Sequence, residues 1–105
     1  MDSLSAKLAA DILLLDLTGI TLIADYFVIA TGESERQLRT MSRSLEQEIK
    51  EKHHIAPLSI EGTASAGWIL LDYGSVVVHL FSERQRKRYN LEEFWSNART
   101  VVRIA

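Results

Sequence analysis

Apolar and polar positions alternate most regularly between residues 68 and 81, in the run WILLDYGSVVVHLF. Alternation with a period of two is typical of β-strands, and a glycine in the middle of the run indicates a tight turn. The run therefore predicts a β-hairpin with Tyr73 and Gly74 as its two-residue loop, which places Trp68 opposite His79. A loop of three residues would change this register.

The predicted hairpin has one uniformly apolar face and one mixed face, because successive side chains of a strand point to opposite sides. The apolar face carries Ile69, Leu71, Val76, Val78 and Leu80. The mixed face carries Trp68, Leu70, Asp72, Ser75, Val77, His79 and Phe81. Aromatic area beside a carboxylate, a hydroxyl and an imidazole is the composition expected of a recognition surface. The same face is also compatible with a helix that covers it and with a histidine satisfied inside the fold.

The other segments predict further strands and a short helix. Residues 3–10 suit an amphipathic helix, and Asp11–Leu17 is a nearly continuous apolar run. Such a run predicts a strand buried on both faces, in the middle of a sheet and beside a parallel neighbour. Tyr26–Thr31 is rich in aromatic and β-branched residues and predicts a second strand. Leu58–Glu61 predicts a short strand, and the small residues of Gly62–Gly67 predict a loop.

The segment after the second strand carries the clearest helical pattern. Ser34 and Gln37 have the spacing of a capping box, in which the serine hydroxyl accepts a hydrogen bond from a first-turn N–H. Apolar residues then recur every three or four positions and form one stripe, made of Leu38, Met41, Leu45 and Ile49. The pattern predicts a helix from about Glu35 to Lys52 that docks on the sheet.

A shorter helix is predicted at Leu91–Ala98, with Asn90 as its N-cap. Its apolar stripe would consist of Leu91, Phe94, Trp95 and Ala98. All these elements predict a single α/β domain over residues 1–105, with a mixed β-sheet and helices packed mainly on one face. Both pairings are expected in the sheet, because a strand–helix–strand unit requires a parallel crossover whereas the hairpin is antiparallel.

Composition narrows the function classes. The absence of cysteine excludes disulfides, thiolate zinc sites and a cysteine nucleophile. A net charge of −2 argues against a general nucleic-acid binder, and the local basic cluster of Arg84, Arg86, Lys87 and Arg88 has the pattern of a solvated helix or loop. Apolar runs are far shorter than the roughly 20 residues that span a bilayer, and Asp2 is atypical of a secretory signal. A cytoplasmic protein without membrane contact is therefore expected.

Residue spacing predicts neither a metal site nor a catalytic site. His53 and His54 are adjacent and would diverge in a helix, and His79 has no second histidine at ligand spacing. The Gly32–Ser34 turn could hold phosphate on free backbone N–H groups, but its central glutamate would repel an anion. No paired carboxylates for Mg²⁺ follow this turn. The turn is therefore interpreted as a helix cap, and no cofactor is expected.

The ordered set of segments resembles the ribosomal silencing factor family, RsfS, also called Iojap. The matching pieces are DILLLDL, ADYFVIATG, SERQ, EG, GWILLDYGSVVVHLF and RYNLEEFW, which extend from about Lys7 to Trp95. The chain departs from the family pattern at Ser75, where the family usually has an acidic residue. The resemblance implies a fold similar to nucleotidyltransferases but without their catalytic carboxylates.

The resemblance also implies a function that does not involve a catalysed reaction. A member of this family would bind protein fourteen of the large ribosomal subunit, obstruct joining with the small subunit and repress translation, with no small-molecule substrate. The resemblance implies contact through Trp68, Asp72, Tyr73 and His79, and it favours a recognition face over a covered one. Strand parity adds Leu70, Val77 and Phe81 to the expected partner-binding residues.

Two alternatives and one further contact stay open. The Gly32–Ser34 turn could belong to a small nucleotidyltransferase-like enzyme. The aromatic face could instead be a homodimer interface, and family members are often dimeric. The basic run Arg84–Arg88 would touch ribosomal RNA from the rim of the contact.

Overall fold

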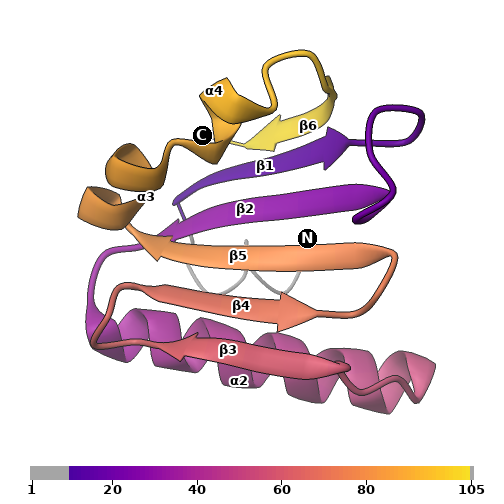
Figure 1. The fold of residues 1–105 in the computed structure, drawn as a ribbon. Helices are drawn as coiled ribbons and strands as arrows, with labels where there is room; N and C mark the ends of the chain where they lie inside the picture. Colours follow the sequence, from indigo (N-terminus) through magenta and orange to yellow (C-terminus); the bar gives the residue numbers. More distant parts are fainter. Residues whose placement is uncertain (1–9, 105) are drawn as a thin grey trace.

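A six-stranded mixed sheet forms the body of the protein (Figure 1). The computed structural model describes residues 10–104; the helix expected at residues 3–10 lies almost wholly outside this range. The strands are β1 (Ala10–Asp16), β2 (Tyr26–Gly32), β3 (Ser59–Thr63), β4 (Trp68–Asp72), β5 (Val76–Ser82) and β6 (Arg99–Ile104). The helices are α2 (Glu35–His53), α3 (Glu83–Tyr89) and α4 (Leu91–Phe94). Across the sheet the order is β3-β4-β5-β2-β1-β6.

The sheet mixes parallel and antiparallel pairs, as expected. Strands β2 and β5 are parallel, and the chain between them passes through α2 and the antiparallel pair β3–β4. The expectation that β1 has a parallel neighbour is wrong, because β1 pairs antiparallel with both β2 and β6. Its apolar run instead reflects an inner position in the sheet, with apolar clusters packed against both faces.

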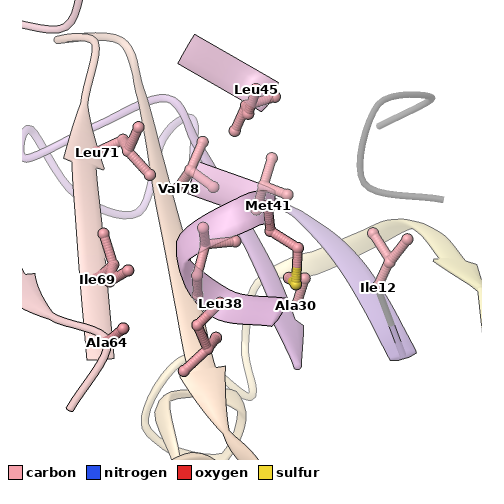
Figure 2. Close-up of a cluster of buried hydrophobic side chains, with 11 residues drawn as sticks. Ile12, Ala30, Leu38, Met41, Leu45, Ala64, Ile69, Leu71 and Val78 are labelled. Atoms are coloured by element: carbon pink, nitrogen blue, oxygen red, sulfur yellow. The ribbon is translucent and has the colours of Figure 1, made fainter. Parts of the chain in front are cut away.

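One face of the sheet is covered by α2, which runs along it in Figure 1. The hydroxyl of Ser34 accepts from the Gln37 N–H at 3.1 Å, which confirms the predicted cap. Leu38, Met41 and Leu45 are buried, and Figure 2 shows them directed toward the strands. Their partners are side chains of the sheet that include Ile12, Ala30, Ile69, Leu71 and Val78. The predicted apolar stripe therefore forms the larger core.

The opposite face holds a second core, closed by the segment after α3. Its buried members are Leu13, Leu15, Leu17, Ala24, Phe27, Ile29, Val77 and Phe81. Leu91, Trp95 and Ala98 pack against it from the C-terminal segment. The long helix thus lies on one face, while the shorter segment closes the other.

The predicted helix at Leu91–Ala98 is wrong in extent and in its cap. Helix α4 has four residues, and Phe94 is 73% exposed, so Phe94 does not share the buried stripe. Asn90 adopts a left-handed conformation with φ +46° and makes no side-chain cap, because it already ends α3 through its N–H to the Arg86 carbonyl. Strand β6, which follows α4, was not predicted from the sequence.

The hairpin is confirmed, but its turn lies one residue later than predicted. Tyr73 N–H donates to the Val76 carbonyl at 2.9 Å, so the two loop residues are Gly74 and Ser75. Gly74 has φ +85°, which glycine adopts without strain at the first position of such a loop. Trp68 consequently lies opposite Phe81. Each strand keeps its parity, so the two predicted faces are unchanged.

Candidate functional site

The seven predicted contact residues divide by strand. Trp68, Leu70 and Asp72 of β4 are half-buried on the mixed face of the sheet. Tyr73 is half-buried too, but it packs against the core on the α2 side. Val77, His79 and Phe81 of β5 are buried. The expected recognition face is therefore open along β4 and closed along β5.

His79 lies inside the second core, packed against Phe27. Its side chain is 4% exposed, and its ring lies 4.6 Å from the ring centroid of Phe27. Burial lowers the pKa of His79 to about 4, so the imidazole is neutral at physiological pH. The indole N–H of Trp68 donates to its Nδ1 at 3.2 Å, which places the ring proton on Nε2. His79 thus fixes the orientation of the indole from the neighbouring strand β5.

The burial of Val77, His79 and Phe81 has one physical cause. These side chains occupy a central strand, and Leu91 and Trp95 of the C-terminal segment pack over the same face. Parity assigned them correctly to the face of Trp68, but parity gives no information on what covers a face.

The accessible part of this face forms a shallow pocket of about 270 Å³. Its walls are Trp68 and Leu70 of β4, Glu61 and Gly62 of β3, Ala66 and Tyr89. The rings of Trp68 and Tyr89 have centroids 4.5 Å apart. We call Glu61, Trp68, Leu70, Asp72 and Tyr89 the aromatic patch.

Glu61 and Tyr89 of the patch were not predicted as site residues from the sequence. Glu61 pairs with Leu70 across β3 and β4, and so shares the face of Trp68. The sequence predicted a strand at Glu61 but not that it pairs with β4. Tyr89 reaches the patch only because α3 packs against the end of β5.

Asp72 uses one carboxylate oxygen in a hydrogen bond within the protein, which leaves the other for a partner. Its Oδ1 accepts from the N–H of Gly74 at 2.8 Å, which stabilises the turn. Within residues 10–104, neither Asp72 nor Glu61 forms an ion pair. The aromatic patch therefore carries two carboxylates available to a cationic partner.

A larger hollow of about 730 Å³ lies beside the Gly32–Ser34 turn. Its charged lining residues are Asp11, Glu33, Glu83, Arg86, Lys87 and Glu92. Carboxylates outnumber cations there, and the Gln37 Oε1 already accepts from the Glu33 N–H at the start of α2. This charge balance opposes a triphosphate.

Arg86 departs from the expectation of a solvated basic run, because it is only 7% exposed. Its guanidinium donates to the Asp11 carbonyl, to Thr31 Oγ1 at 2.8 Å and to Glu92 Oε1 at 2.7 Å. Arg86 is therefore a structural tie between α3, β1 and β2. Arg84, Lys87 and Arg88 are exposed, as expected.

Over the described residues, no group of three or more histidine, aspartate or glutamate side chains is placed to hold a metal ion. No helix among residues 10–104 is long and apolar enough to cross a membrane. The fold and the patch define a small α/β domain that presents an aromatic and acidic surface.

Comparison with known proteins identifies the family. The family model described as "Ribosomal silencing factor during starvation" matches residues 1–104. The ribosomal silencing factor RsfS of Bacillus subtilis is 44% identical over 92 residues, covering 88% of this chain and 77% of that protein. A solved structure from Chromobacterium violaceum superposes with a TM-score of 0.84 at 32% identity, covering 90% of this chain and 78% of that one. A structure from Bacillus halodurans gives 0.80 at 35% identity, covering 96% and 90%. The chain belongs to the ribosomal silencing factor family, as its sequence pattern indicated.

Proposed function

We propose that this protein is a translational repressor of the cytoplasm that binds the large ribosomal subunit through its protein fourteen. The bound domain blocks joining with the small subunit by occupying space, and no reaction is required. Membership of the ribosomal silencing factor family is the observation that carries this proposal.

The aromatic patch is the proposed docking surface. Trp68 supplies a large, half-buried anchor whose orientation is fixed by its hydrogen bond to His79. Glu61 and Asp72 supply negative charge beside it, which suits a basic ribosomal protein. Leu70 lies between the two carboxylates and contributes apolar area.

The other predicted contact residues take supporting positions. Val77, His79 and Phe81 lie beside the patch on the neighbouring strand β5, and the Phe81 ring stacks on Trp68 at a centroid distance of 5.1 Å. Tyr73 lies on the α2 side, so we propose that it stabilises the hairpin end and does not join Trp68 in the contact.

Co-sedimentation with isolated large subunits tests the docking surface. Wild type should bind, Trp68→Ala should bind about 30-fold more weakly as expected for an aromatic anchor, and Asp72→Lys should also lose affinity. Phe94→Ala is the matched control, because it truncates an exposed aromatic outside the patch. Urea unfolding of each variant should separate lost contact from lost folding. Equal binding by all four proteins would contradict the proposal.

Subunit joining tests the mechanism. Added wild type should lower the fraction of assembled ribosomes when small subunits are mixed with large ones, and Trp68→Ala should not. A protein that binds large subunits while assembly proceeds unchanged would disprove steric obstruction.

Exposed cations beside the patch extend the proposal to ribosomal RNA. Arg84, Lys87 and Arg88 lie on α3, which ends at Tyr89 of the patch. Replacing all three with glutamine should reduce the salt dependence of binding, because fewer counterions are released from phosphates. An unchanged salt dependence would contradict a contact between these side chains and ribosomal RNA.

Self-association through the same patch is the competing use of this surface. Trp68→Glu should abolish ribosome binding if the patch docks on the large subunit. A monomeric Trp68→Glu variant that still co-sediments with large subunits would assign the patch to a homodimer.

A further inference from the structure

The pocket within the aromatic patch has the size of a single side chain. Its volume of about 270 Å³ lies just below the range of roughly 300–1,000 Å³ typical of small-molecule sites. Two aromatic rings and an aliphatic side chain form its walls, and its lining includes the small residues Gly62 and Ala66. The pocket therefore suits one long, narrow group better than a nucleotide or a cofactor.

The floor of the pocket depends on close approach of two strands. Gly62 has φ +80°, and a Cβ at this position would lie 2.1 Å from the backbone oxygen of Trp68. Only glycine permits this approach without displacing the backbone of β3 or β4. The space beside Trp68 is thus built into the strand pairing.

Charge and ring geometry together select a cation. Glu61 is exposed at the rim and has no ion-pair partner in the part of the chain that the structure describes. Trp68 and Tyr89 contribute aromatic rings to the lining, and the negative quadrupole of a ring face attracts cations. Asp72 is the diagonal neighbour of Glu61 on the same face and adds to the negative potential. The pocket thus combines a carboxylate with two aromatic rings.

One internal cation already lies near this pocket. The guanidinium carbon of Arg88 is 5.9 Å from the centroid of the Tyr89 ring, close to the outer limit of about 6 Å for a cation–π contact. Arg88 is exposed and forms no ion pair within residues 10–104. A loosely held arginine over one ring does not fill the space between Glu61 and Trp68.

We infer that this pocket receives an arginine side chain of the partner protein, with the guanidinium paired to Glu61 and stacked on Trp68 and Tyr89. A planar guanidinium suits both interactions, because it stacks on ring faces and forms two parallel hydrogen bonds to a carboxylate. The inference rests on the proposed function, since it names the partner chemistry that the aromatic patch recognises.

A titration followed by NMR tests the pocket without the ribosome. The probe is N-acetyl-arginine methylamide added to the ¹⁵N-labelled chain, and the signal is the indole N–H of Trp68. The probe should shift this signal in wild type, and the apparent affinity should fall at least about fivefold in Glu61→Gln. N-acetyl-norleucine methylamide, which lacks the charge, should cause little shift. Equal shifts with both probes, or in both proteins, would overturn the inference, and a stronger response to the lysine amide would replace arginine by lysine.

Large-subunit binding then separates this inference from the proposed function. Glu61→Gln should weaken co-sedimentation about tenfold, and Tyr89→Leu should weaken it while Tyr89→Phe, which keeps the ring, should not. Glu51→Gln removes the same charge from the exposed side of α2 and is the matched control. Loss of binding in Trp68→Ala with wild-type binding in Glu61→Gln would refute the pocket and retain the docking surface. Absence of binding by wild type would refute the proposed function, and the NMR titration would still decide the pocket.

Discussion

At the scale of single residues, His79 shows that the sheet face of a side chain can be predicted from the sequence while its exposure cannot. Its place on the face of Trp68 follows from strand parity, whereas its burial follows from Leu91 and Trp95 packing over that face. The imidazole accepts the Trp68 indole N–H and leaves its own Nε2 without a hydrogen-bond partner in the described structure. A neutral ring is the form compatible with this setting, because a buried imidazolium would lack a counter-charge.

The stability of the protein should depend on pH through His79. The folded state keeps this ring neutral down to about pH 4, because burial lowers its pKa from 6.5 to about 4, while the unfolded chain takes up the proton near pH 6.5. Stability from this group is therefore complete above pH 6.5 and falls as the pH decreases toward 4. At roughly 1.4 kcal/mol for each pH unit, the loss at pH 4 is about 3 kcal/mol.

His79→Gln should remove this pH dependence, because an amide oxygen can accept the indole N–H but does not titrate. The measurement is urea unfolding of both proteins between pH 7 and pH 4. Exposed carboxylates and the other two histidines are common to both proteins, so their effects cancel in the difference. Parallel profiles for the two proteins would show that His79 is not the group responsible.

At the scale of elements, Arg86 of α3 connects to three other segments, of which β1 and β2 are distant from it in sequence. Its guanidinium reaches β1 through the Asp11 carbonyl, β2 through Thr31, and the start of α4 through Glu92. Arg86→Ala should lower the free energy of unfolding by about 3 kcal/mol, since it breaks a largely buried charged network. Arg84→Ala, in the same helix but exposed, should change it by less than about 0.5 kcal/mol. Equal effects of the two substitutions in urea unfolding would contradict this role.

Elements with a hydrophobic pattern in their own residues could be predicted from the sequence. Elements that depend on contacts with other segments could not. The capped helix α2 and the strands β1, β2, β4 and β5 each carry their own periodicity or apolar run. Helix α4 begins at Leu91 as its pattern suggests but ends at Phe94, and Asn90 ends α3 instead of capping α4 with its side chain. Every position of β6 is exposed, so the strand has no alternation of buried and exposed residues. It is defined only by its pairing with β1.

The candidate site divides in the same way. Trp68, Leu70 and Asp72 could be grouped by parity within one strand. Glu61 joins them only through the pairing of β3 with β4, and Tyr89 only through the packing of α3. Neither relation is encoded in the local pattern of hydrophobic and polar positions.

At the scale of the whole molecule, two cores share one sheet. Helix α2 covers the first core. Both tryptophans, Trp68 and Trp95, pack against the second core, so their fluorescence follows its unfolding. Met41→Ala removes a fully buried side chain from the first core and should cost about 2–5 kcal/mol. Because a domain of this size usually unfolds in one step, tryptophan fluorescence and far-UV circular dichroism should show the same lowered urea midpoint. A fall in the dichroism midpoint alone would mean that the cores unfold separately.

The two outer strands of the sheet differ in a way that bears on handling of the protein at high concentration. Strand β6 carries Arg99 and Arg103, each tied to an aspartate of β1, and charge of this kind discourages other chains from adding to a sheet. Within residues 10–104, the outer side of β3 pairs with no other strand, and Ile60 of β3 and the preceding Leu58 are exposed. Aggregation in concentrated stocks should therefore begin at β3 in preference to β6, which also exposes apolar side chains but carries the two paired arginines.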